Sequence, residues 1–261
     1  ERLGINVGDK VRVVRRGDVI PKVIESLGRA TKADLVGRKH ANGEEFDGKL
    51  PPKEAINIPE NCPKCDNDLV IDGAFLKCLD LSCGARQVHS LIYWCRALEM
   101  DGIGVKLAEQ LSESGLVDSI ADMYNLDMQN LLTLERMAEK SASNVLAEIE
   151  ATRNLTLTQF LAALGLPKIG PELAEAFAEN VGSLESLMEL VEHRNDAPAT
   201  DDDGNQAKHN DAIASLIEID GVGSTVAERL LNGLAQRQDM ISRLNEALTI
   251  SDVEKRVATG S

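Results

Sequence analysis

Downstream of residue 96 the apolar residues recur with a helical period, and the predicted helices come in pairs joined by short turns. Four pairs share one pattern, and their turns align at Gly104, Ala138, Gly170 and Gly223. The intervals are 34, 32 and 53 residues, and the last becomes 34 when the 19 residues of a polar stretch, 193–211, are left out. So regular a repeat predicts an all-α domain of four units over residues 96–245, with a disordered acidic insert at about residues 193–211.

The turns between the paired helices carry the candidate chemistry. "DGIG" and "DGVG" each contain two glycines, "LPKIG" contains one, and "LERMAEK" contains none. Glycine permits a positive φ and leaves no Cβ between the backbone and a ligand. The following helix begins with unpaired N–H groups at the positive end of its dipole, which suits a phosphate. These features indicate helix-hairpin-helix units, which hold the DNA backbone without reading its sequence, whereas "LERMAEK" is expected to pack rather than bind.

The predicted phosphate contacts of the hairpins combine glycines with nearby lysines. They are Gly102, Gly104, Lys106, Lys168, Gly170, Gly221 and Gly223. Lys106, Lys140 and Lys168 lie in or just after three of the turns, where an ammonium group can join the same phosphate. A single such turn is also compatible with an ordinary connection between helices, and the whole array with a repeat that docks another protein.

The segment from residue 5 to 26 has a different pattern, in which apolar and charged residues alternate. This period predicts β-strands with turns at Gly8-Asp9 and at residues 16–18. Arg15, Arg16 and Lys22 belong to the most basic stretch of the chain and are candidate DNA contacts on a small barrel. The alternative is a solvated strand face. Residues 1–58 are too short for a complete five-stranded barrel and are predicted to be its C-terminal part, with earlier strands missing.

Four cysteines lie close together in the sequence, as Cys62-x2-Cys65 and Cys78-x4-Cys83. The residues between the two pairs predict a short hairpin that turns at Asp72-Gly73 and brings the pairs together. Four thiolates leave no open position on a metal, so the predicted ion is a structural zinc in a finger over residues 59–95. The alternative is a set of unliganded or redox-active thiols. Two neighbours receive other roles, His89 as a bystander and Cys95 as a core residue.

Composition modifies this picture in three respects. Hydrophobic residues make up 43% of the chain and aromatic residues 3%, which favours aliphatic, helical cores. Five cysteines with four in one cluster favour a reducing, cytoplasmic compartment, and no apolar run is long enough to span a membrane. A net charge of −15 argues by itself against binding to nucleic acid, although net charge does not describe a local groove.

The order of these parts resembles the C-terminal half of bacterial-type NAD-dependent DNA ligases. The resemblance rests on "VGDKVRVVRRGDVIPKV", "IPENCPKC", "ALEMDGIGVKLAEQL", "ALGLPKIGPELA" and "IDGVGSTVAERL", which cover nearly the whole chain. It implies a multidomain α+β protein with a partial OB-fold, a four-cysteine zinc finger and a helix-hairpin-helix domain. Residues 246–261 would be a linker and the start of a truncated BRCT domain, and both ends of the chain are expected to continue into a longer protein.

The function implied by this resemblance is the sealing of nicks in double-stranded DNA. Members of the family transfer AMP from NAD to a lysine in a K-x-D-G motif, and this motif does not occur in the chain. The resemblance therefore implies that NAD and magnesium bind outside this chain, which would be inactive alone and would close around nicked DNA as a monomer. The alternative is a free-standing, non-catalytic DNA-binding module.

Overall fold

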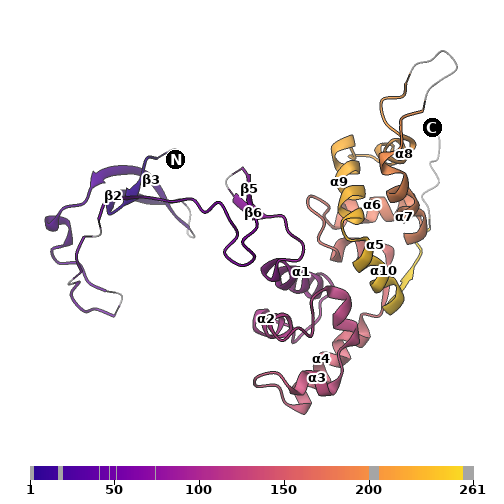
Figure 1. The fold of residues 1–261 in the computed structure, drawn as a ribbon, viewed down its shortest axis with the longest axis horizontal. Helices are drawn as coiled ribbons and strands as arrows, with labels where there is room; N and C mark the ends of the chain where they lie inside the picture. Colours follow the sequence, from indigo (N-terminus) through magenta and orange to yellow (C-terminus); the bar gives the residue numbers. More distant parts are fainter. Residues whose placement is uncertain are drawn as a thin grey trace. The chain divides into compact units, whose positions relative to one another are not determined.

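The computed structural model describes residues 3–16, 20–40, 42–46, 48–50, 52–73, 75–199 and 206–254, with only the backbone of Arg16. The chain divides into two units, Glu1–Asn61 and Cys62–Ser261. The first unit contains strands and one short 3-10 helix, and the second contains a β-hairpin followed by a helical array (Figure 1). Each unit is described separately below.

The alternating segment of the first unit forms two short antiparallel sheets. Strand β1 (Asn6–Val7) pairs with β4 (Glu54–Ala55), and β2 (Asp9–Arg16) pairs with β3 (Ile20–Arg29). Gly8 has a φ of 83°, which lets the chain reverse between β1 and β2. Helix η1 (Lys32–Leu35) follows β3. Asp34 of this helix forms an ion pair with Lys10, with 2.5 Å between Oδ1 and Nζ.

The sequence predicted only the C-terminal part of an OB-fold barrel, and no closed barrel is present among the described residues. The two pairs of strands form separate sheets in the described part of this unit. The apolar side chains Val13, Ile20 and Leu27 are exposed on the β2–β3 pair, which accordingly lacks a buried core among the described residues.

The second unit begins with the predicted hairpin between the cysteine pairs. Strand β5 (Leu69–Asp72) pairs with β6 (Phe75–Cys78), with Leu69 opposite Cys78 and Asp72 opposite Phe75. Gly73 has a φ of 63° at the turn. Cys83 is the N-cap of α1 (Gly84–Ala97), so one continuous helix crosses the domain boundary predicted at residue 95.

The helical array follows as consecutive pairs whose two helices pack against each other (Figure 1). The pairs are α1 with α2 (Val105–Glu113), α3 (Met128–Leu132) with α4 (Glu139–Ala151), α5 (Leu157–Ala163) with α6 (Pro171–Val181), and α8 (Asp211–Ile217) with α9 (Ser224–Ala235). The remaining helices are η2 (Ile120–Asn125), α7 (Leu184–Glu192), η3 (His193–Asn195) and α10 (Gln238–Ala247). Among the described residues, no helix combines the length and the apolar character needed to cross a membrane.

A mainly aliphatic core runs through the described part of this array, and it includes the aromatic side chains Trp94, Tyr124, Phe160 and Phe177. Trp94 is fully buried and makes edge-to-face contacts with Tyr124 and Phe160, at centroid distances of 6.4 and 5.9 Å. The Trp94 Nε1–H donates to the Tyr124 hydroxyl at 3.0 Å, and this hydroxyl lies 3.2 Å from Thr152 Oγ1. The buried polar groups are thus paired, and the network joins α1, η2 and the end of α4.

The stretch predicted as a disordered insert has ordered contacts at both of its described ends. Residues 193–195 form η3, and Asn210 is 6% exposed. The Asn210 side-chain amide donates to the carbonyl oxygens of Arg194 at 2.8 Å and Asp196 at 3.2 Å, while its oxygen accepts from the Ile213 N–H. Asn210 therefore ties the two ends together and caps α8.

The C-terminal segment predicted as a linker returns to the helical array. Strand β8 (Thr249–Ser251) pairs in parallel with β7 (Asn154–Thr156), and the Val253 N–H donates to the Gly182 carbonyl at 2.8 Å. The residues "VATGS", predicted to begin a BRCT domain, lie outside the described residues.

Candidate nucleic-acid interface

The turns of the four helix pairs share one backbone conformation. The second helix of each pair begins after an extended N-cap residue, and these N-caps are Gly104, Ala138, Gly170 and Gly223. Two residues before each N-cap the chain adopts a positive φ, at Gly102 (80°), Arg136 (63°), Lys168 (68°) and Gly221 (77°). The residues aligned in the sequence are therefore the residues from which a new helix begins.

Buried residues on either side of the N-cap fix each turn to the core. The residue directly before it is Ile103, Ile169 or Val222 in three turns, each at most 6% exposed. The fourth residue of the second helix is an alanine in all four pairs, and each is fully buried: Ala108, Ala142, Ala174 and Ala227. A side chain this small allows the paired helices to approach closely, and the turn between them is held rigidly.

The three glycine N-caps have no internal reason to be glycine. Gly104, Gly170 and Gly223 have φ values near −90°, which other residues also adopt. A Cβ built on any of them would meet no described atom within 4 Å. Ala138 occupies the same position in the second turn, so this backbone accommodates a Cβ. What these glycines leave open is the space outside the turn, where another molecule can approach the backbone.

The backbone donors at these turns are available to such a molecule. Gly104, Gly170 and Gly223 provide no side-chain cap, so the first N–H groups of α2, α6 and α9 have no capping side chain among the described residues. Pro171 at the start of α6 removes one of these donors. The positive end of each helix dipole lies at the same place, and the arrangement favours an anion.

The second turn differs from the other three, in agreement with the absence of glycine from its sequence. The Ala138 N–H donates to Ser141 Oγ at 3.0 Å, and the Glu135 N–H donates to Gln110 Oε1 at 2.8 Å. The N–H of the N-cap residue therefore has a side-chain partner in this turn, and no such partner is found for the three glycine N-caps among the described residues. The Glu135 N–H does not distinguish this turn, because the Asp101 N–H at the same place in the first turn donates to Glu148 Oε2 at 3.2 Å.

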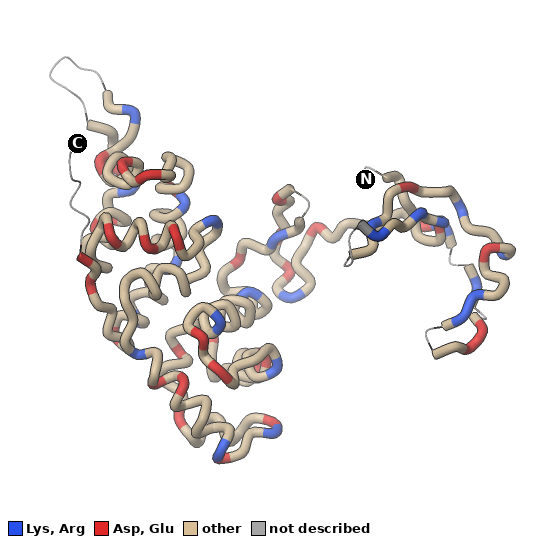
Figure 2. Tube along the Cα trace, turned by 180° about the vertical axis from the view of Figure 1, so that it is seen from behind, with Lys and Arg blue, Asp and Glu red and all other residues tan. Residues whose placement is uncertain are grey.

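The lysines predicted to assist the turns are exposed. Lys106 lies in the first turn of α2, and Lys168 lies in the third hairpin. Neither forms an ion pair within the described part of the chain. Figure 2 shows Lys and Arg at separate points along the helices, with Asp and Glu between them. Main-chain groups must therefore contribute much of any attraction for an anion.

Sequence reasoning placed Lys168 beside a turn but missed its conformation. Lys168 and Arg136 take the left-handed position that glycine occupies in the first and fourth turns. Alignment of the four turns at the N-cap, extended two residues toward the N-terminus, would have identified both residues.

The basic residues of the first unit are not gathered on one face. Arg15 lies opposite Pro21 and Lys22 lies opposite Val14, so Arg15 and Lys22 lie on opposite faces of the β2–β3 pair. Both side chains are exposed. Arg16 ends β2, opposite Ile20. Arg15 and Lys22 therefore cannot contact the same phosphate group from one face of this strand pair, and the helical unit offers the better defined interface.

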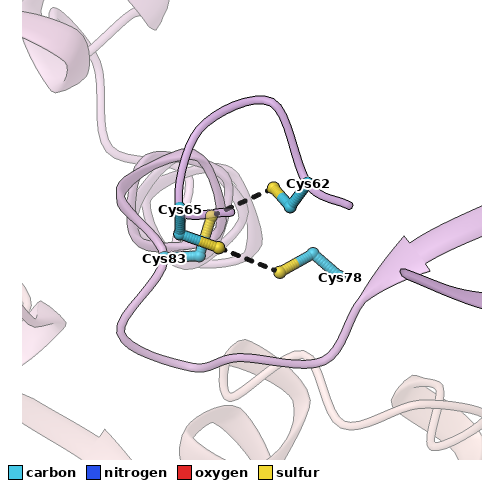
Figure 3. A group of neighbouring side chains, drawn as sticks. All are labelled: Cys62, Cys65, Cys78 and Cys83. Atoms are coloured by element: carbon cyan, nitrogen blue, oxygen red, sulfur yellow. Dashed lines mark hydrogen bonds between the residues drawn. The ribbon is translucent and has the colours of Figure 1, made fainter. Parts of the chain in front are cut away.

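The four cysteines of the second unit form a compact cluster (Figure 3). Their sulfur atoms all lie within 4.8 Å of one another, with Cys62 Sγ 3.9 Å from Cys83 Sγ and Cys65 Sγ 3.6 Å from Cys78 Sγ. A disulfide requires about 2.05 Å. Four sulfurs about 2.3 Å from one tetrahedral zinc are about 3.8 Å apart. The cluster thus has the ligand type and spacing of a four-coordinate metal site.

The thiols of this cluster differ in pKa. The N–H groups of Lys64 and Cys65 lower the pKa of the Cys62 thiol to about 7, which favours the thiolate that metals bind, whereas burial and the neighbouring thiols raise the pKa of Cys65 and Cys78. Cys62 and Cys83 are buried, while Cys65 and Cys78 are partly exposed. His89 is exposed and is not part of the cluster. Cys95 lies in the core, where burial raises its pKa to about 12.

Paired helices with glycine-capped turns, combined with a four-cysteine site, define a helix-hairpin-helix protein. The model of the SAM-like helix-hairpin-helix tandem family matches residues 96–151 and 160–199. These ranges include the first three turns described above.

Curated proteins similar to the chain are named DNA ligase. The one from Koribacter versatilis is 32% identical over 99% of the chain, and the one from Halorubrum lacusprofundi is 35% identical over 85%. The one from Helicobacter hepaticus is 39% identical over 73%. The chain belongs to the DNA ligase family, and it spans about one third of the length of these relatives, with shares of 34%, 29% and 27%.

Proposed function

We propose that this chain is the DNA-clamping, C-terminal part of an NAD-dependent DNA ligase. In this proposal the glycine-capped turns hold the phosphate backbone of nicked duplex DNA, and the four cysteines hold a structural zinc. Adenylation takes place elsewhere in the enzyme, where NAD and magnesium bind, and the chain does not seal nicks alone. Repair and replication of DNA would both use this activity.

The observation that carries the proposal is the set of three glycine N-caps at exposed helix N-termini. Their φ values and their surroundings do not require glycine, and each faces open space. A duplex backbone is an extended polyanion, and several fixed N–H donors can bind its phosphates together. The similarity to DNA ligases over nearly the whole chain supports the choice of this ligand.

The cysteine cluster has a supporting role in this proposal. Cys83 is the N-cap of α1, and α1 is the first helix of the first hairpin pair. A metal held by Cys62, Cys65, Cys78 and Cys83 would therefore fix the β5–β6 hairpin to the helical array. Four thiolate ligands leave no position for substrate, so the metal would stabilise the structure and take no part in the reaction.

The direct test is binding of the chain to a labelled nicked duplex, followed by fluorescence anisotropy. We expect binding that does not depend on base sequence, because contacts to the backbone carry no sequence information. Affinity should fall as salt rises, and each phosphate neutralised by a lysine or arginine should make the slope of log affinity against log salt concentration more negative by about 0.9. An absence of binding at about 50 mM salt, the lower end of the usual range for such titrations, would contradict the proposal.

A free-standing DNA-binding module would pass this binding test as well. Addition of the chain to a purified adenylation half of a related ligase separates the two possibilities. Restored nick sealing is expected for a ligase part, whereas a non-catalytic module would bind DNA and leave sealing unchanged. A protein-docking repeat would fail to bind the duplex.

A further inference from the structure

One cavity of the second unit contains three arginines that take no part in the hairpin turns. It has a volume of about 680 Å³ and is lined by Arg86 of α1, Arg229 of α9 and Arg237, which follows α9. Leu79 and Leu81, which follow β6, form another part of the wall. The cavity therefore lies where the cysteine-bearing hairpin meets the end of the helical array.

Two of these arginines are held in place by backbone carbonyls. Arg86 Nη1 donates to the Leu79 carbonyl at 2.6 Å, and Arg237 Nη1 donates to the Gly233 carbonyl at 2.9 Å. A guanidinium has five N–H donors, so each keeps donors for a ligand. Since each is already anchored, little side-chain freedom remains to be lost when a ligand binds.

The positive charge of this cavity is only partly balanced, since Arg229 interacts with the more distant Asp72 carboxylate while Arg86 and Arg237 contact no carboxylate among the described residues. Arg86, Arg229 and Arg237 form no ion pair with a carboxylate among the described residues. Arg153, another partly buried arginine, does have such a partner, Glu150 at 2.6 Å. One carboxylate, that of Glu228, lines the cavity. Burial and the neighbouring charge of Arg86 lower the pKa of Arg237, as expected for cations kept together without an anion.

The cavity adjoins two of the turns that face open space. Its wall includes Pro167, directly before Lys168 in the third hairpin, and Thr225, the second residue of α9. Gly223, the N-cap of α9, lies two residues before Thr225. A DNA strand held at these turns would therefore pass close to the cavity.

We propose that this cavity binds a phosphate group of the DNA backbone through Arg86 and Arg237. Guanidinium groups match the geometry of phosphate oxygens and bind them with two hydrogen bonds. The site would extend the clamp from the hairpin turns to the joint between the cysteine cluster and α9. This inference rests on the proposed function, since it takes its phosphate from duplex DNA.

The test compares the single variants Arg86→Gln and Arg237→Gln with Arg194→Gln in binding to a nicked duplex. Arg194 is a matched control, because its Nη1 also donates to a backbone carbonyl, that of Val191 at 2.6 Å, but it does not line the cavity. Each cavity variant should lose about tenfold in affinity, as expected for a charged hydrogen bond, and the salt slope should fall by about 0.9. Glu228→Gln should bind more tightly. Equal affinity of all three arginine variants would overturn the proposal.

A second measurement uses the wild-type protein and does not depend on how the variants fold. The Nε–H signals of Arg86 and Arg237 are followed by NMR during separate titrations with nicked duplex and with inorganic phosphate. Saturation by the duplex with weak, unsaturated shifts from phosphate supports the proposal. Saturation by phosphate alone would assign the cavity to a free anion, and unmoved signals in both titrations would exclude an anion site. Failure of the duplex to bind at all would instead contradict the proposed function.

Discussion

At the scale of single residues, the residue at the N-cap position of each turn determines whether a phosphate can reach the helix N-terminus. Gly104, Gly170 and Gly223 leave the helix N-terminus uncovered, whereas Ala138 places a methyl group there. The fold accommodates both glycine and alanine at this position. The choice between them therefore affects how closely another molecule can approach the backbone N–H groups.

Gly104→Val should lower affinity for nicked duplex by about tenfold, since a β-branched side chain separates the N–H groups from a phosphate and a charged hydrogen bond contributes about 1.5 kcal/mol or more. The cost in folding stability should be about 1 kcal/mol or less, because the extended backbone there accepts a side chain and only capping is affected. Fluorescence anisotropy and thermal unfolding measure the two effects separately.

Ala138→Val provides the matched control, because the second turn has the same backbone but the Ala138 N–H already donates to Ser141 Oγ. It should change affinity by less than twofold, within the usual effect of an uninvolved surface residue of about 0.5 kcal/mol. Equal losses from Gly104→Val and Ala138→Val would mean that the glycine N-caps have no special role.

The sequence predicted these residues well where a repeat was available for comparison. The alignment of the four turns located the N-cap of each second helix, since the turn residue recurs at a nearly constant distance once residues 193–211 are left out. It did not predict the positive φ of Arg136 and Lys168, because residues other than glycine rarely adopt this conformation and carry no sequence signal for it. The arginine cavity was also missed, since its residues come from separate elements.

At the scale of elements, the cysteine cluster and the hairpin turns differ in what holds them together. The turns are fixed by buried aliphatic residues on both sides of the N-cap. The β5–β6 hairpin has exposed apolar side chains, including Ile71 and Phe75, and its strands contribute little to the core. A small module of this kind depends on a metal for its stability.

Cys62→Ser should therefore abolish stoichiometric zinc binding, measured by elemental analysis of the purified protein, and should expose the β5–β6 amides to rapid hydrogen exchange. Cys95→Ala is the matched control, because Cys95 lies in the core outside the cluster. That variant should retain its zinc and lose about 1 kcal/mol of stability from the removed sulfur. Stoichiometric zinc in Cys62→Ser would refute the ligand assignment.

In the strand-rich first unit, the sequence predicted the strands but not how they pair into sheets. Alternation predicted strands over residues 5–26, and the structure has β2 and β3 there. Alternation specifies which residues share a face, but it does not specify how many strands join one sheet. The pairing of β1 with β4 joins strands distant in the sequence, and the placement of Arg15 and Lys22 on opposite faces follows from the register of the β2–β3 hairpin.

At the scale of the whole chain, the question is how a protein of net charge −15 binds a polyanion. Asp and Glu lie between the cations along the helices (Figure 2), so long-range attraction to DNA should be weak. Main-chain donors at three turns act only at short range and do not change the net charge. Acidic side chains can therefore cover other surfaces while these turns bind phosphates.

The most direct measurement of this claim follows the backbone amide signals of the chain by NMR during titration with a nicked duplex at about 50 mM salt. We predict saturable shifts at Gly104, Gly223 and the first residues of α2, α6 and α9, with Ala138 and the start of α4 unchanged. Shifts confined to lysine and arginine side chains, with these amide signals unmoved, would contradict the account.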